Sequence, residues 1–283
     1  MERIKQALER ARAERDAVAG GNAAAAQSSD AGREAPRIRR MTRPASAALN
    51  IVYTQTTKIA VDPERLRERR IVAMSDSEPA ANAYKVLRTH VLQRMRVKGW
   101  RTLAVTSVGE AEGKTVTAIN LALSLAGDVN QTVLLVDLDL RRPSIGRFFS
   151  GDPLPGISDY LTDDRPIAEL LINPGVDRFV ILPGNHSFTH SSEMLSSPKM
   201  VGLIEELKGR YADRLVLLDM PPVLAGDDVI AFSPHVDAVM LVVEEGKTTK
   251  QDLAEACALL DEAKIIGTLL NKAEQAAVGV GYY

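Results

Sequence analysis

A run of apolar residues, TLAVTS, is followed by a loop that carries Gly109 and Gly113 and then by Lys114 and Thr115. Glycine lets backbone N–H groups curl around phosphate oxygens, and a helix that begins after the loop adds the positive end of its dipole. At this spacing a lysine reaches the β- and γ-phosphates of a nucleotide, and a hydroxyl can bind Mg²⁺. The stretch therefore predicts a phosphate-binding loop, although Val108 stands where the general pattern has its first glycine.

Two elements must position this loop, one before it and one after it. The run TLAVTS predicts a short buried strand over residues 102–107. Beyond the lysine, apolar residues recur at the i, i+3, i+4, i+7 spacing of a buried helix face: Ile119, Ala122, Leu123 and Ala126. The loop is thus predicted to join the carboxyl end of a strand to the amino end of a helix.

Acidic residues stand at the ends of two other predicted strands. Asp137 and Asp139 end the run TVLLVDLD and precede two arginines and a proline, and Asp219 ends the run RLVLLD before two prolines. Open α/β sheets bind ligands at the carboxyl ends of their strands, so we expect these acids beside the phosphates. Asp227 and Asp228 come at the predicted start of the next helix, where a helix cap and a functional role are both open.

Predicted strands and helices alternate through most of the chain. Further strands are predicted at RFVIL, DAVMLVV and KIIGTLLN, the last of which ends at Asn271. Helices are predicted at SEPAANAYKVLRTHVLQRMRV, at SSEMLSSPKMVGLIEELKGR and at TTKQDLAEACALLDEA. The first of these helices is expected to bury one face, which carries Ala83, Val86, Leu87, Val91 and Met95. The alternation predicts an α/β fold of the P-loop NTPase type, with a mostly parallel sheet flanked by helices.

Composition excludes several classes of protein. With 283 residues, of which 45% are hydrophobic and 25% charged, the chain has the composition of a soluble globular protein. No uncharged apolar run approaches the roughly 18 residues of a membrane-spanning helix, and the charged N-terminus is unlike a secretory signal. A single cysteine permits no internal disulfide, in agreement with a reducing compartment. We therefore expect a cytoplasmic location, with a peripheral position at the inner face of the plasma membrane left open.

The N-terminal region differs from the rest in charge. Residues 1–70 carry 15 Lys and Arg against 9 Asp and Glu, whereas the remainder of the chain is acidic. Residues 1–16 have the spacing of an amphipathic helix, which could dock on a partner or a membrane surface or lie loosely on the protein. An Ala-, Gly- and Ser-rich linker follows and includes four arginines: Arg37, Arg39, Arg40 and Arg43. They could contact anionic lipid or be merely solvated, and since no aromatic residues interleave with them we expect no nucleic-acid partner.

Three stretches together, EAEGKT, LLVDLDLRRP and LLDMPP, resemble the bacterial tyrosine kinases (BY-kinases) of capsule and exopolysaccharide assembly. In that family they correspond to the Walker A, Walker A′ and Walker B motifs. The similarity extends over roughly residues 80–272 and is closest to the cytoplasmic, stand-alone kinase type. It implies an ATP- and Mg²⁺-dependent protein-tyrosine autokinase that regulates exopolysaccharide synthesis and export.

The resemblance also implies roles for individual residues. The nucleotide would be bound by the loop and by a position that contacts adenine in related ATPases: Gly109, Glu110, Ala111, Glu112, Gly113, Lys114, Thr115, Val116 and Asn271. The catalytic residues would be Lys114, Asp137, Asp139 and Asp219. Thr115, Asp137 and Asp219 would hold the metal, and Asp137 would also assist deprotonation of the incoming tyrosine hydroxyl. Tyr282 and Tyr283 are the candidate phosphate acceptors, or else a solvated end of the chain.

The chain departs from the family pattern in two places. Ala111 stands where relatives usually have glycine, and an alanine forced to φ > 0 would cost about 1 kcal/mol or more. The family's oligomer-forming E-x-x-R-x-x-R motif aligns with Asn82, Lys85 and Arg88, so only its last position is retained. The resemblance still implies a homo-oligomer, of a size that the altered motif leaves open. Because the chain has no membrane span of its own, it also implies a transmembrane activator of the polysaccharide co-polymerase type.

Two other functions remain open at this stage. One is a switch ATPase related to the division-site and partitioning ATPases, and the other is a non-catalytic nucleotide-binding scaffold. The expected organisation has four segments: residues 1–50, an amphipathic helix plus a disordered basic linker; residues 51–76, a lead-in; residues 77–275, the P-loop kinase domain; and residues 276–283, a flexible tail with the tyrosines.

Overall fold

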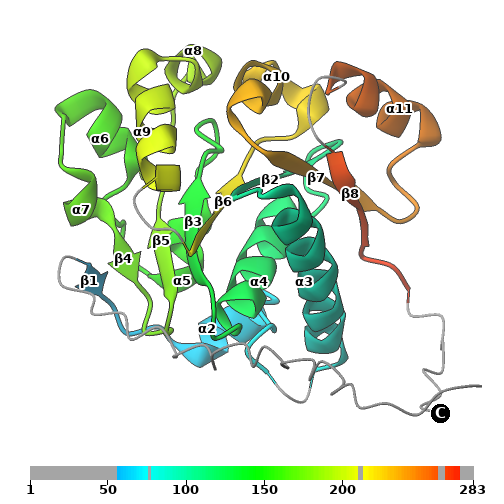
Figure 1. Cartoon of the computed structure of the whole chain (residues 1–283), viewed down its shortest axis with the longest axis horizontal. Coiled ribbons are helices and arrows are strands. Elements are labelled where there is room, and N and C mark those ends of the chain that lie inside the picture. Colours follow the sequence, from blue (N-terminus) through cyan, green and yellow to red (C-terminus); the bar gives the residue numbers. More distant parts are fainter. Residues whose placement is uncertain (1–55, 76–77, 210–212, 261–264, 275–283) are drawn as a thin grey trace, which may run out of the picture. The chain divides into compact units, whose positions relative to one another are not determined.

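Apolar runs of the sequence form the strands of one central sheet, which Figure 1 shows between two layers of helices. The computed structural model describes residues 56–75, 78–209, 213–260 and 265–274, all of which belong to one compact unit. The expectations for residues 1–50 and for the tyrosines at the C-terminal end lie outside the described residues.

The sheet has eight strands in the order β1-β4-β5-β3-β6-β2-β7-β8. The strands are β1 (Thr57–Lys58), β2 (Thr102–Ser107), β3 (Thr132–Asp137), β4 (Ile172–Asn173), β5 (Phe179–Leu182), β6 (Arg214–Asp219), β7 (Ala238–Glu244) and β8 (Ile265–Asn271). All neighbouring strands pair in parallel except β4 and β5. The expected mostly parallel α/β sheet is therefore confirmed.

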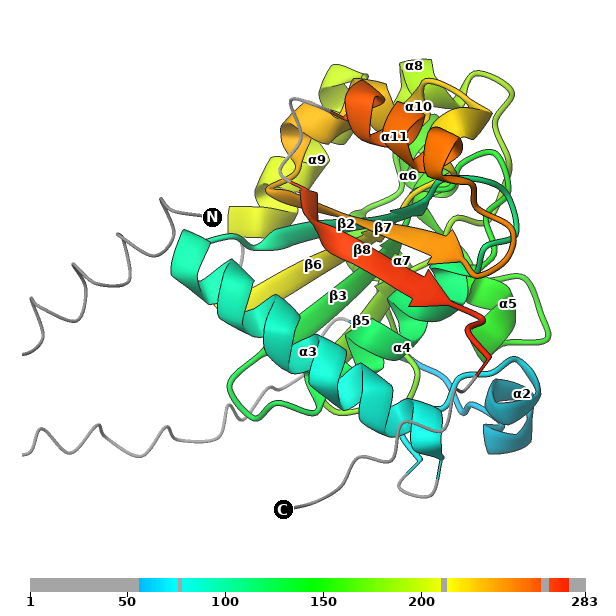
Figure 2. The same ribbon diagram turned by 90° about the vertical axis from the view of Figure 1, so that its right-hand side faces the viewer.

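Helices cover both faces of this sheet. They are α2 (Pro63–Glu68), α3 (Pro79–Lys98), α4 (Lys114–Ala126), α5 (Ile145–Phe149), α6 (Ile157–Asp163), α7 (Ile167–Leu170), α8 (Ser191–Leu195), α9 (Pro198–Gly209), α10 (Asp228–Phe232) and α11 (Lys250–Leu259), with 3₁₀ turns η1 (Val223–Ala225) and η2 (Ser233–His235). In Figure 2, α3 and α4 lie below the sheet and α8 to α11 lie above it. None of the helices in the described ranges has the length and apolarity that a membrane span requires.

Side chains of β2 alternate between two hydrophobic cores. Leu103 and Val105 pack with residues of α3 and α4, whereas Ala104 packs on the opposite face with residues of α9 and α10. Every residue of β2 is buried, because a parallel strand inside a three-layer fold is covered on both faces. This explains why its middle residues, Leu103 to Val105, are consecutively apolar.

Two local predictions are wrong. The helix predicted over SSEMLSSPKMVGLIEELKGR is two helices, since Pro198 has no N–H to continue α8 and instead begins α9. On α3, Ala83 and Val86 are exposed, and the buried residues are Ala81, Val91, Leu92 and Met95. Helix α3 has apolar residues on more than one side, so their spacing alone does not identify the side that packs on α4. Leu87 is half-buried.

Candidate active site

The predicted phosphate loop joins the end of β2 to the start of α4, as its sequence indicates. Val108 is buried and its N–H donates to the carbonyl of Val242 on β7, so it extends the strand and the loop starts at Gly109. Gly113 is the N-cap of α4 with φ of 93°, and a Cβ there would collide with Nδ2 of Asn271. Only glycine satisfies both the backbone conformation and the close approach.

The buried carboxylate of Glu112 braces the loop from within. Its Oε2 accepts a hydrogen bond from the N–H of Gly109 at 2.9 Å, and its Oε1 accepts one from the hydroxyl of Thr248 at 2.5 Å. Asn271, at the end of β8, donates from Nδ2 to the carbonyl of Glu112 at 2.8 Å. Residues after β7 and at the end of β8 thus hold the loop in shape. The role predicted for Asn271 at adenine stays a prediction.

Two lysines, one after β7 and one after β8, donate hydrogen bonds to backbone carbonyls of the loop. Lys272 donates to the carbonyl of Ala111 at 2.8 Å, and Lys247 donates to the carbonyl of Glu110 at 2.5 Å. Ala111, whose carbonyl accepts from Lys272, adopts φ of 59°, in the left-handed region. The loop therefore does require a positive φ at this position, and the alanine introduces strain of about 1 kcal/mol.

Lys114 lies between carboxylates from two strands. Its Nζ is 2.8 Å from Oδ2 of Asp139, which follows β3, and 3.3 Å from Oδ1 of Asp219, which ends β6. Burial alone would lower the pKa of Lys114, but the carboxylates of Asp219 and Asp139 raise it overall, so the ammonium is charged at neutral pH. Thr115 donates to Oδ2 of Asp219 at 2.6 Å. Side chains from the start of α4, from the end of β6 and from the residues after β3 therefore contact one another.

Asp137 is fully buried at the end of β3, directly beside Asp219 in the sheet register. Its Oδ2 accepts hydrogen bonds from the N–H groups of Ser144 at 2.8 Å and Ile145 at 2.9 Å. Its Oδ1 has no hydrogen-bond partner among the described residues. Burial, and next the charge of Asp219, raise the pKa of Asp137 to about 7. Burial also raises the pKa of Asp219, although Lys114 opposes this.

A cavity of about 460 Å³ adjoins these groups. Its lining includes Glu110, Ala111, Gly113, Lys114, Thr115 and Val116 of the loop and helix, together with Asp139, Arg141, Arg142 and the two prolines after β6. The structure thus brings the predicted loop residues and Asp139 to one cavity, with Asp137 and Asp219 beside it. Three residues outside the cavity lining stabilise the loop through hydrogen bonds: Gly109, Glu112 and Asn271.

The two arginines after Asp139 form ion pairs that local spacing does not reveal. Arg141 lies 2.8 Å from Oδ2 of Asp228, which is buried at the start of α10, and Arg142 lies 3.0 Å from Oε2 of Glu110. Asp227 occupies the N-cap position of α10 but makes no side-chain capping hydrogen bond there. Asp228 therefore anchors Arg141.

The oxygen atoms at this site fit a magnesium ion. Mg²⁺ is bound through one or two carboxylates together with hydroxyl, water and phosphate oxygens. The hydroxyl of Thr115 and the carboxylates of Asp137 and Asp219 supply such atoms, and the unpartnered Oδ1 of Asp137 is one of them. Within the described ranges no group of three or more His, Cys, Asp or Glu side chains is arranged to hold a metal alone.

Known proteins are similar to this chain over most of its length. The kinase domain of VpsO has 31% sequence identity and a TM-score of 0.61, over 75% of this chain and 98% of that domain. The tyrosine-protein kinase YwqD of Bacillus subtilis (strain 168) is 28% identical over 207 residues, which cover 72% of this chain and 86% of YwqD.

A longer relative is the succinoglycan biosynthesis transport protein ExoP of Rhizobium meliloti (strain 1021), which is 29% identical over 219 residues and 75% of this chain. This chain spans 27% of the length of ExoP, and the same share of the two EpsB proteins of Ralstonia that it also matches. No protein-family model matches the chain.

Proposed function

Because this chain belongs to the bacterial tyrosine kinase (BY-kinase) family, we propose that it transfers the γ-phosphoryl group of ATP to protein tyrosine. One observation carries the proposal: Lys114 at the start of α4 contacts Asp139, which follows β3, and both Lys114 and Thr115 contact Asp219, which ends β6. Phosphoryl transfer depends on positioning and on neutralising phosphate charge, and this convergence provides for both.

Each part of the site has a role in this reaction. The N–H groups of the loop and the start of α4 bind the phosphates, and Lys114 neutralises their charge. Thr115, Asp137 and Asp219 would hold Mg²⁺, which would supply further positive charge at the phosphate oxygens. Asp137 would also assist removal of the proton from the acceptor hydroxyl, and its raised pKa suits this exchange near neutral pH.

We further propose that the activity regulates exopolysaccharide synthesis and export. The name of ExoP, a succinoglycan biosynthesis transport protein, supports this setting. The acceptors are the chain's own Tyr282 and Tyr283, the activator is a transmembrane protein of the polysaccharide co-polymerase type, and the protein works as a homo-oligomer in the cytoplasm or at the inner membrane surface.

The test is phosphotyrosine formation by the full chain with ATP and Mg²⁺, measured by mass spectrometry. Lys114→Met should lower the rate at least about 100-fold, because the charge opposite the phosphates is lost. Lys208→Met is the control, since Lys208 pairs with Glu205 on α9 and not with the loop, and it should retain most of the activity. Changing both tail tyrosines to Phe should remove the main phosphorylated peptide.

Other outcomes would contradict the kinase assignment. ATP hydrolysis without phosphotyrosine, even with a membrane activator added, would favour the switch ATPase. Tight ATP binding without any turnover would favour the nucleotide-binding scaffold.

A further inference from the structure

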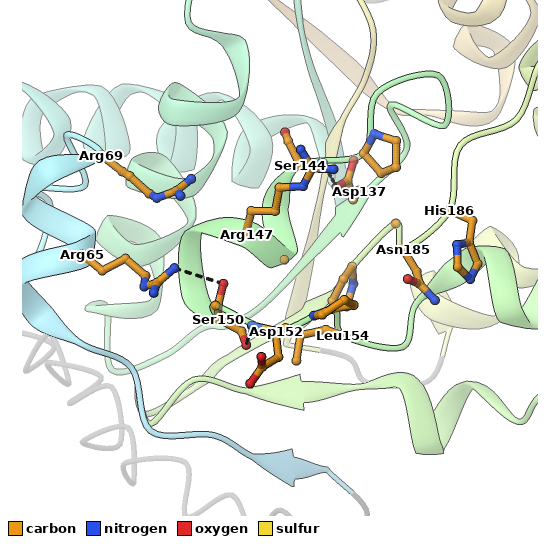
Figure 3. Close-up of a pocket in the computed structure, with 16 residues that line it drawn as sticks. Arg65, Arg69, Asp137, Ser144, Arg147, Ser150, Asp152, Leu154, Asn185 and His186 are labelled. Atoms are coloured by element: carbon orange, nitrogen blue, oxygen red, sulfur yellow. Dashed lines mark hydrogen bonds between the residues drawn. The ribbon is translucent and has the colours of Figure 1, made fainter.

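A second cavity, of about 380 Å³, lies beside the end of β3 (Figure 3). Ser144 lines both this cavity and the cavity of the phosphate loop, so the two cavities adjoin. The remaining walls come from α2, from α5 and the residues after it, and from residues 183–186 after β5. Apart from Asp137, which is part of the wall, no residue of the proposed nucleotide site lines it. Its volume lies in the lower part of the range of about 300–1,000 Å³ that is typical of sites for small molecules.

Three arginines line the second cavity. Arg65 and Arg69 are about one helical turn apart at α2, and Arg147 comes from α5. Figure 3 shows that their side chains extend from two separate elements toward the same space. None of the three arginines forms an ion pair with another described residue, and the acids of α2, Glu64 and Glu68, do not line the cavity. The cavity therefore carries positive charge that no ion pair within the described ranges offsets.

Contacts between α2 and the region of α5 place two of these arginines at the cavity wall. The Arg69 guanidinium lies 5.4 Å from the centre of the Phe148 ring, and Arg65 donates to the carbonyl of Ser150 at 3.3 Å. A Cβ on Gly151 would come within 3.1 Å of the Arg65 guanidinium, so glycine at this position leaves room for that group. An aromatic ring and a carbonyl position the two side chains without neutralising their charge.

Two oxygen acceptors lie elsewhere in the lining. The Asp152 carboxylate, after α5, is exposed and forms no ion pair with a described residue. Asn185 lies on the side of the cavity opposite α2 (Figure 3). Its Nδ2 donates to the two carboxylate oxygens of Asp159 at 3.0 and 3.1 Å, and its Oδ1 accepts no hydrogen bond within the described ranges. Ligand hydroxyl groups can donate to both acceptors, which are separate from the guanidinium groups.

We propose that this cavity binds a hexose phosphate, with the phosphate at the three arginines and sugar hydroxyls at Asp152 and Asn185. A phosphate ester has three acceptor oxygens and close to two negative charges at neutral pH, so it suits three guanidinium groups better than a single carboxylate does. The planar N–H fork of a guanidinium binds two phosphate oxygens through parallel hydrogen bonds. This site is additional to the kinase function and does not depend on it.

Isothermal titration calorimetry on the full chain tests the proposal. ADP and Mg²⁺ are present in excess so that the phosphate loop is occupied, and the three probes are glucose 1-phosphate, inorganic phosphate and glucose. We expect glucose 1-phosphate to bind at least about tenfold more tightly than either of the other probes, because only it engages both the arginines and the hydroxyl acceptors. Its affinity should fall at high salt, which screens the guanidinium charges.

Substitutions in the lining identify the site. Arg147→Gln and Arg65→Gln should each weaken the binding of glucose 1-phosphate about three- to tenfold. Arg67→Gln is the matched control, since it removes the same charge from α2 at a residue outside the lining, and it should leave the affinity unchanged. Asp152→Ala should reduce the preference for glucose 1-phosphate over inorganic phosphate, because it removes a hydroxyl acceptor and a charge that repels both probes.

Two outcomes would overturn the proposal. Equal affinity for glucose 1-phosphate and inorganic phosphate would leave only an anion site without sugar recognition. Binding that is lost in Lys114→Met but kept in Arg147→Gln would place the ligand in the phosphate-loop cavity instead. Neither measurement requires phosphoryl transfer, so a failure of the kinase assignment would leave the result for this cavity unchanged.

Discussion

The two cavities that meet at the end of β3 differ in how their charges are balanced. In the phosphate-loop cavity every lining cation has a carboxylate partner in the described structure: Lys114 with Asp139, Arg141 with Asp228 and Arg142 with Glu110. The second cavity, of about 380 Å³, is lined by Arg65, Arg69 and Arg147, which form no ion pair with any residue in the described ranges. Paired charges hold their side chains in one arrangement before a ligand arrives, whereas unpaired ones leave a positive potential that attracts an anion. The side chains of the first cavity are thus held in place before a ligand binds, whereas the second cavity keeps a positive potential.

Asp137, which lines the second cavity and lies beside the first, gives the largest expected effect. Its pKa is raised to about 7 by burial, and next by Asp219, so the folded protein binds its proton more tightly than the unfolded chain does. The stabilisation that the proton provides is complete below about pH 4 and is lost as pH rises through about 7. Asp137→Asn should therefore exceed the wild type in free energy of unfolding at pH 8, by on the order of 2–4 kcal/mol, and approach it at low pH.

Urea unfolding between pH 4 and pH 8, without nucleotide, measures this difference. Asp152→Asn is the control, since Asp152 is exposed in the second cavity and its substitution should leave the pH dependence unchanged. If the free energies of unfolding of the wild type and Asp137→Asn changed in parallel with pH, the burial of a charge at Asp137 would be contradicted.

Glu112 tests whether the loop cavity is pre-arranged. Glu112→Gln keeps an amide oxygen for the N–H of Gly109, but it removes the negative charge from both hydrogen bonds and forces the bond to the Thr248 hydroxyl to reverse its direction. We expect a loss of about 1–3 kcal/mol in unfolding free energy, together with weaker ATP binding. Glu110→Gln removes only an exposed pair with Arg142 and should change stability by less than about 1 kcal/mol. Urea unfolding measures both free energies. Equal losses in Glu112→Gln and Glu110→Gln would mean that the buried carboxylate does not stabilise the loop more than the exposed one does.

Ala111 gives the smallest effect and concerns the same loop. Its φ of 59° favours glycine, so Ala111→Gly should raise the melting temperature, by the equivalent of about 1 kcal/mol. At Ala83, an exposed residue inside α3, the same substitution should instead destabilise by about 0.5–1 kcal/mol. Calorimetry on both variants compares the signs. A loss at position 111 would mean that relief of strain does not outweigh the added freedom of the unfolded chain.

The central strands are predictable because burial on both faces gives each at least three consecutive apolar residues. β1 and β4 are not, since each has two residues and their pairing joins positions far apart in the chain. The buried side of α3 is ambiguous for the related reason that its apolar residues do not form a single stripe. Patterns within one segment therefore predict most elements, but not how the short ones pair.

The same limit applies to the site. Lys114, Asp139 and Asp219 were expected together, because the carboxyl ends of parallel strands meet at one edge of the sheet. The partners of Glu112 and Arg141 could not be found in this way, since they belong to separate connections that only the packed fold brings near. The arginines of the second cavity carry no local signal either, because α2 and α5 become neighbours only in the folded chain.

The pairing of Asp137 with Asp219 in adjacent strands has a consequence for changes in chain length. Successive side chains of a strand point to opposite faces, so an insertion or deletion of one residue inside β3 or β6 would turn its acid to the other face. It would also shift the acid away from its neighbour. Such length changes can be accommodated only in the connections, for example in those that lead from α4 to β3 and from α9 to β6.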